Sequence, residues 1–115
     1  MKILSVTAID MASAVPPTQE QMQRMGVFME ECKSRGILLD TGGRYPQMQE
    51  FTVQRKDGTT TVTDGPFTES KEFVGGYALM EVKDRDEAIE ITNRFLDLIG
   101  NATCRILEVG ASPEF

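Results

Sequence analysis

One stretch near the middle of the chain gathers residue types that could do chemistry. It runs from Asp64 to Tyr77 and reads DGPFTESKEFVGGY. Aspartate followed by glycine and proline favours a turn, because Asp bonds nearby backbone, Gly permits positive φ and Pro fixes φ. The same carboxylate, held at a strand end beside a cleft, could serve as a general base, since desolvation raises a carboxyl pKa. The sequence leaves both interpretations of Asp64 open.

Other residues could line the same cleft. Gly75 and Gly76 would let the backbone of the next strand pass close to Asp64. Tyr77 could present its phenol there, or lie in the core with its hydroxyl at the edge. With Asp64 as the candidate catalytic residue, the candidate ligand-binding residues are Arg44, Tyr45, Gly65, Pro66, Phe67, Lys71, Gly75, Gly76 and Tyr77.

The remaining reactive side chains favour simpler interpretations. Glu69, Lys71 and Glu72 flank the turn and are typical of a solvated rim, although Lys71 could position an anionic ligand. Cys32 and Cys104 have no metal-binding spacing and no visible activating neighbour, so we interpret both as small core residues. The sequence therefore predicts no metal site and no cofactor.

Composition excludes several classes of function. The chain has a net charge of −6, which opposes binding to nucleic-acid phosphates or to anionic lipid. No apolar run approaches the roughly 20 residues that span a bilayer, and the first residues do not form a secretory signal. We therefore expect a cytoplasmic protein. Because the chain contains no histidine, Ser-His-Asp and Cys-His mechanisms are excluded within it.

Periodicity predicts the elements that must position these residues. Alternating apolar residues predict a strand over residues 2–9, and helical spacing predicts a helix from about Gln19 to Arg35, between Thr18 as N-cap and Gly36. A second helix begins after Asp84. Further strands are expected from residue 37 to the glycines at 42–43, and over 51–56, 59–63, 77–82 and 103–109, with a tight hairpin turn at residues 57–58.

The resulting order is β-α-β, a β-hairpin region, then β-α-β. It predicts a single α+β domain over residues 1–115, a ferredoxin-like β-α-β-β-β-α-β domain with one antiparallel sheet and two helices on one face. We expect residues 110–115 to form a loose tail. Because helices would cover only one side of the sheet, the bare apolar face predicts a homodimer in which two sheets meet face to face.

The central motif also resembles that of a known family. Asp-Gly-Pro-Phe, followed by Glu, Lys-Glu and Gly-Gly-Tyr, resembles the signature of the YCII-related domain family in its Asp-Gly-Pro-Phe subgroup, and the layout of nearly the whole chain fits. The resemblance implies dimeric α/β-barrel proteins, similar to a group that includes muconolactone isomerase-like enzymes. Some relatives have been proposed as enzymes with a His/Asp pair. Here Asp64 matches the motif aspartate, and no histidine can partner it.

Three functions follow from these observations. The favoured one is a non-catalytic module that binds a small molecule in a cleft near Asp64 at the sheet face. The resemblance also implies a regulatory partner, because family members sometimes occur alongside transcription sigma factors. The alternative is an isomerase-like or lyase-like enzyme that uses Asp64 as general acid and base without histidine. In the third, the motif is a rigid strand connection only.

Overall fold

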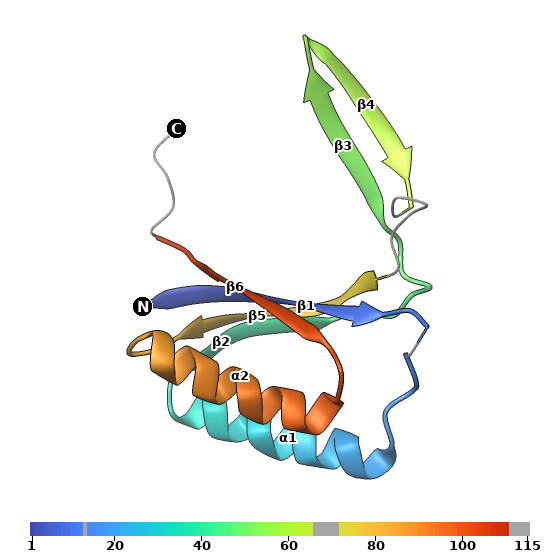
Figure 1. Cartoon of the computed structure of the whole chain (residues 1–115). Coiled ribbons are helices and arrows are strands. Elements are labelled where there is room, and N and C mark those ends of the chain that lie inside the picture. The colour runs from blue at the N-terminus through green and yellow to red at the C-terminus, as the bar shows by residue number, and fades with distance from the viewer. Residues whose placement is uncertain (13, 66–71, 111–115) are drawn as a thin grey trace.

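Figure 1 shows the computed structural model of the chain, in which residues 1–12, 14–65 and 72–110 are described. The elements in chain order are β1 (Lys2–Asp10), α1 (Gln19–Ser34), β2 (Leu38–Gly43), β3 (Phe51–Lys56), β4 (Thr59–Asp64), β5 (Glu72–Glu81), α2 (Arg85–Ile99) and β6 (Thr103–Glu108). This confirms the predicted order. The candidate residues Pro66, Phe67 and Lys71 lie outside the described residues, as do residues 111–115 of the predicted tail.

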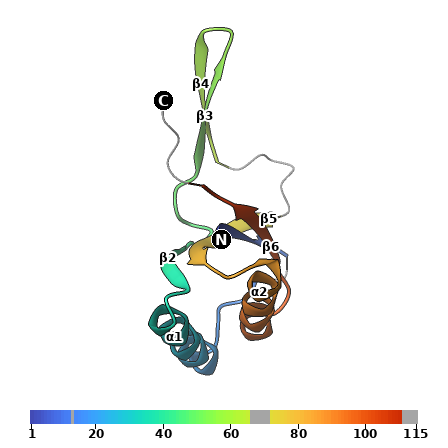
Figure 2. The same cartoon turned by 90° about the vertical axis from the view of Figure 1, so that its left-hand side faces the viewer.

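Four strands form the main sheet in the order β2-β5-β1-β6, and all neighbours are antiparallel. Both helices cover one face of this sheet, and the other face is left open by them (Figures 1 and 2). β1 and β5 are the central strands. The arrangement confirms the α+β, ferredoxin-like fold.

The helices begin where their capping residues predicted. Thr18 forms a complete capping box: its Oγ1 accepts from the Gln21 backbone N–H at 3.1 Å, and the Gln21 side chain accepts from the Thr18 N–H at 2.8 Å. Asp84 caps α2 by accepting from the Glu87 N–H at 2.9 Å. Met22, in the first turn of α1, is 56% exposed.

The core lies between the helices and the covered face of the sheet. In β1, Ile3, Ser5 and Thr7 are buried, whereas the alternate residues are only half-buried. The buried β1 residues therefore face the helices, where Ala88 and Ile91 of α2 are also almost fully buried. The period-2 alternation of β1 thus decides which residues remain on the open face.

The hairpin formed by β3 and β4 stands away from the main sheet. It rises on the side opposite the helices (Figures 1 and 2). Its turn has positive φ at both Asp57 and Gly58, 51° and 78°, which suits the twist of a two-residue hairpin loop. Every residue of both strands is exposed. The radius of gyration is accordingly 16.1 Å, against about 13 Å for a compact chain of this length.

Candidate functional site

The open face of the main sheet is mostly apolar. Residues directly opposite each other in neighbouring strands share a face, so the strand register gives its membership. We call this surface the open sheet face; its apolar and aromatic members are Leu4, Val6, Ala8, Val74, Tyr77, Leu79 and Leu107. Tyr77, Val74 and Leu107 are each 40% exposed. A contiguous apolar surface of this kind is typical of an interaction or ligand site.

Tyr77 places a polar group on this apolar face. Its hydroxyl donates to Asp40 Oδ2 at 2.9 Å, and its backbone carbonyl accepts from Thr41 Oγ1 at 2.8 Å. The ring lies against Gly42, where an added Cβ would meet Tyr77 Cε1 at 2.7 Å. The hydrogen bond to Asp40, together with the negative charge of that carboxylate, raises the pKa of Tyr77. The phenol is therefore held protonated and aimed at β2.

The two glycines of β5 shape the sheet around Tyr77. An added Cβ on Gly76 would lie 2.6 Å from the carbonyl oxygen of Gly42 in β2. At the neighbouring position, the register between β1 and β5 shifts, and an added Cβ on Gly75 would meet Ile9 Cδ1 at 2.5 Å. The close approach at these glycines is to strands β2 and β1, and the approach to Asp64 stays a prediction.

Arg44 joins the main sheet to the base of the hairpin. Its Nη1 donates to the Val74 carbonyl at 2.9 Å and lies 3.7 Å from Glu50 Oε1, while its Nη2 donates to the Gln49 carbonyl at 3.3 Å. These contacts use the guanidinium to fix the segment that leads into β3. Tyr45, the next candidate, has an exposed side chain.

Asp64 ends β4 at the base of the hairpin. It lies directly opposite Phe51, and the backbone N–H of the following Gly65 donates to the Glu50 carbonyl at 2.7 Å. The Asp64 side chain is exposed and makes no hydrogen bond or ion pair within residues 1–12, 14–65 and 72–110. Because Glu50 also contacts Arg44, the hairpin base and the open sheet face are connected through that arginine.

Two hollows lie in the surface of the chain. One of about 430 Å³ lies between α1 and α2, and one of about 580 Å³ lies beside the end of β1 and the start of β5; neither is lined by Arg44, Asp64 or Tyr77. The second hollow reaches the open sheet face at Ala8 and Thr103, whereas the first lies on the helix side of the sheet.

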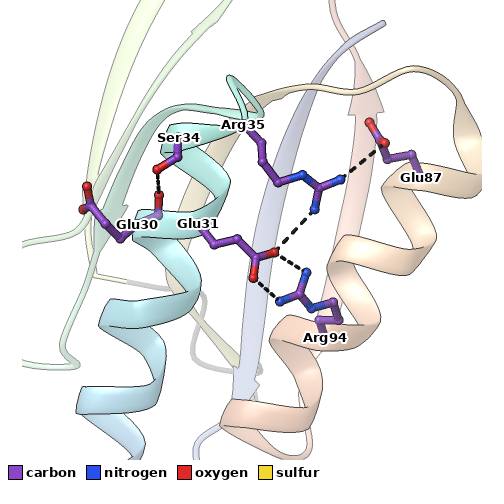
Figure 3. A network of polar contacts seen from close by, with 6 residues as sticks. All are labelled: Glu30, Glu31, Ser34, Arg35, Glu87 and Arg94. Atoms are coloured by element: carbon purple, nitrogen blue, oxygen red, sulfur yellow. Dashed lines mark hydrogen bonds and ion pairs between the residues drawn. The ribbon is translucent and has the colours of Figure 1, made fainter.

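The hollow between the helices contains a charged network that the sequence did not reveal (Figure 3). Arg94 of α2 makes two hydrogen bonds to the carboxylate of Glu31 in α1, at 2.6 and 2.9 Å, and Arg35 lies 3.4 Å from the same carboxylate. Arg94 also lies 4.9 Å above the ring of Phe28. The hydrogen bonds from Arg94 lower the pKa of Glu31. These charged groups pair with one another, so the cluster stabilises the contact between α1 and α2.

Comparison with protein families identifies the chain. Residues 1–95 match the family model of the YCII-related domain, which covers the opening strand, both glycines of β5 and most of α2. The chain belongs to the YCII-related domain family. This confirms the resemblance of the central motif. No curated protein matches this YCII-related domain significantly.

Among solved structures, the fold of this YCII-related domain is similar to that of a CutA1 mutant from Pyrococcus horikoshii OT3. The TM-score is 0.40, at 12% sequence identity, over 99% of this chain and 88% of that chain. Neither helix of the described part is long and apolar enough to cross a membrane. The described residues also contain no group of three or more Cys, Asp or Glu side chains that could hold a metal ion.

Asp40 is the residue that sequence reasoning missed. It lies in β2, where an aspartate is disfavoured by strand propensity, and that mismatch was the available signal. Its partner Tyr77 is 37 positions away, so the pairing depends on the register between β2 and β5. The local pattern around either residue does not contain that register.

Proposed function

We propose that this YCII-related domain binds a small molecule as a homodimer, in a cleft between the open sheet face and the hairpin base near Asp64. The observation that carries the proposal is the hydrogen bond from Tyr77 to Asp40 on a mostly apolar face, whose other polar members include Thr103 and Arg105 of β6. Ligand sites are mostly apolar and hold a few placed polar groups that orient the ligand. The open sheet face has that composition.

A second copy supplies the cover that the site needs. The row Leu79, Leu4 and Leu107 runs across three strands of the open sheet face and is only partly shielded in one chain. Packing a second sheet at about 10 Å would remove this apolar surface from water. The same packing would turn the exposed Tyr77–Asp40 pair into the polar wall of an enclosed space. A two-fold dimer uses one surface on both copies, which the single open face allows.

The chemistry of the pair suggests a class of ligand. Tyr77 already donates its proton to Asp40, so the remaining lone pairs of the Asp40 carboxylate can accept from a ligand. The surrounding Val6, Leu79 and Ala8 favour hydrocarbon. A small, largely apolar molecule that carries a hydroxyl or amino group fits both requirements.

Catalysis by Asp64 is the second candidate function. Its carboxylate has no partner within the described part of the chain, and it shares a hairpin face with Phe51, Val53 and Val62. Burial of that face against another surface would desolvate the carboxylate and raise its pKa toward the range of a general base. With no histidine in the chain, the aspartate would act both as acid and as base. The regulatory partner that the family resemblance implies stays a prediction.

Amide chemical shifts in titrations with small apolar alcohols and amines test the binding proposal. Shifts should gather at Leu4, Gly42 and Leu79 on the open sheet face. Asp40→Asn should weaken binding by about tenfold, the effect of losing one charged hydrogen bond. Asp97→Asn makes the same change at an exposed position of α2, away from the open sheet face; it is the matched control and should bind normally. Shifts confined to the helices, or equal binding by Asp40→Asn, would contradict the proposal.

The same titrations separate binding from catalysis. If the bound molecule is converted, and Asp64→Asn stops conversion without weakening binding, the enzymatic alternative is correct. If the bound molecule remains unchanged with the unaltered chain, the binding function is favoured. Circular dichroism of each variant confirms that the fold is retained, since Asp40 and Asp64 are both exposed in the single chain.

A further inference from the structure

The protruding hairpin has two chemically different faces. The register places Phe51 opposite Asp64 and Val53 opposite Val62 on one face, with Arg55 opposite Thr60 toward the tip. We call these six residues the hairpin apolar face. The other face carries Thr52, Gln54, Lys56, Thr59, Thr61 and Thr63, all polar. Phe51, Val53 and Val62 are 56%, 59% and 61% exposed, so the apolar side of the hairpin is uncovered in one chain.

A hairpin with an exposed apolar face needs a second surface to pack against. An isolated two-stranded hairpin is marginally stable in water, and a third strand or a packed apolar face is needed for independent stability. Contacts with the main sheet occur at the base, through Arg44 and Glu50, and the strands beyond the base are wholly exposed. The exposed apolar side chains of the hairpin therefore need a partner surface that shields them from water.

The charges on this face indicate what that partner is. Asp64 lies at the base of the hairpin opposite Phe51, and Arg55 lies near its tip, with Val53 and Val62 between the two ends. Arg55 Nε donates to Thr60 Oγ1 at 2.6 Å, and within the described residues neither Arg55 nor Asp64 has an ion-pair partner. Turned end to end, a second copy of the same face would place each arginine beside an aspartate. The face is therefore complementary to itself, as a two-fold contact requires.

The dimensions allow this contact. Strands of six residues extend about 20 Å, whereas packed sheets lie about 10 Å apart. The hairpin rises on the open side of the sheet (Figure 1). In a dimer joined through the open sheet faces, the two hairpins would point in opposite directions and would overlap along part of their length.

We propose that the hairpin apolar face packs, antiparallel, on the same face of the hairpin of a second copy, with Arg55 of each copy beside Asp64 of the other. The inference rests on the homodimer of the proposed function and adds a second contact to it. It also changes the surroundings of Asp64, because the second copy then supplies a positive charge to a carboxylate that has no ion-pair partner among the described residues. The hairpin base becomes a site that two chains complete.

Dimer dissociation constants from sedimentation equilibrium test this contact. Val62→Asp places a charge in the apolar centre and should raise the dissociation constant about tenfold or more. Thr61→Asp is the matched control, because it makes the same aspartate one position away on the polar face; it should change the constant less than about threefold. Equal effects of the two variants would overturn the inference.

Charge reversal tests the pairing itself. Arg55→Glu and Asp64→Lys should each weaken the dimer, and the double variant should restore it to within about threefold of the parent, since the pair is then reversed and intact. If the single reversals weaken the dimer and the double variant weakens it further, the hairpins do not pair in this way. All of these positions are exposed in one chain, so circular dichroism should show an unchanged fold.

A sheet variant keeps this inference separate from the proposed function. Leu107→Arg puts a charge on the open sheet face and should give monomers if the sheets meet there. Monomers from Leu107→Arg, with no effect of Val62→Asp, would overturn the hairpin contact and leave the sheet dimer standing. Dimers from Leu107→Arg, together with an unchanged dissociation constant for Val62→Asp, would contradict the proposed function and the hairpin contact together.

Discussion

The phenol of Tyr77 on β5 donates a 2.9 Å hydrogen bond to Asp40 Oδ2 on the edge strand β2. The bond crosses the open sheet face, which the two helices leave uncovered (Figure 2). It places a paired phenol and carboxylate on that mostly apolar surface, and it connects the motif that ends at Tyr77 with a strand that the motif does not include. The proposed site follows from this relationship.

The ionisation of Tyr77 should report this hydrogen bond. In a Tyr45→Phe background Tyr77 is the only tyrosine, and its ultraviolet titration midpoint should lie above its ordinary value of 10.0. Asp40→Asn removes the carboxylate and should bring the midpoint back toward that value. The raised pKa also means that this bond stabilises the fold below pH 10.0 and is lost as pH rises through the pKa of the folded state. An unchanged midpoint in Asp40→Asn would contradict the pairing.

Substitution of Gly76 should destabilise the sheet. An alanine Cβ there would lie 2.6 Å from the backbone carbonyl oxygen of Gly42. Because that neighbour is backbone, the strands must separate, at a cost of about 1–3 kcal/mol in the free energy of unfolding. Gly43→Ala is the control, since its added Cβ has nothing within 4 Å. Urea denaturation should show a lower midpoint for Gly76→Ala, and equal midpoints for the two variants would contradict this packing.

The Glu31–Arg94 pair should make stability depend on acid pH. The folded state lowers the pKa of Glu31 below its ordinary 4.5, chiefly through the hydrogen bonds from Arg94. Its contribution is therefore present above pH 4.5 and is lost as pH falls through the lower pKa of the folded state. Glu31→Gln should be less stable than the parent at neutral pH, and the difference should shrink in acid. A difference that is constant with pH would argue against the pair.

The sequence predicted the elements well because their signals are local. Thr18 with Gln21 determines where α1 begins, and Asp57 with Gly58 determines the hairpin turn; each needs only its near neighbours. The alternation in β1 likewise predicted a strand there. These features made the ferredoxin-like order predictable without the structure.

The site was less predictable because it depends on distant contacts. No local pattern indicates that Tyr77 pairs with Asp40, since the two strands meet only in the folded sheet. The hairpin was predicted, but its projection away from the sheet was not, because turn chemistry does not determine what a hairpin packs against. The same limit applies to Arg44. The sequence predicted it as a residue that lines the cleft, and the structure shows that its guanidinium contacts the Val74 and Gln49 carbonyls at the hairpin base.

The mass of the protein in solution tests the central claim most directly. Size-exclusion chromatography with light scattering, at micromolar concentration, should give twice the chain mass of 12.8 kDa. Leu107→Arg should return the mass toward that of one chain. A parent chain that elutes as a 12.8 kDa monomer would contradict the dimer, and with it the enclosed site at Tyr77 and Asp40.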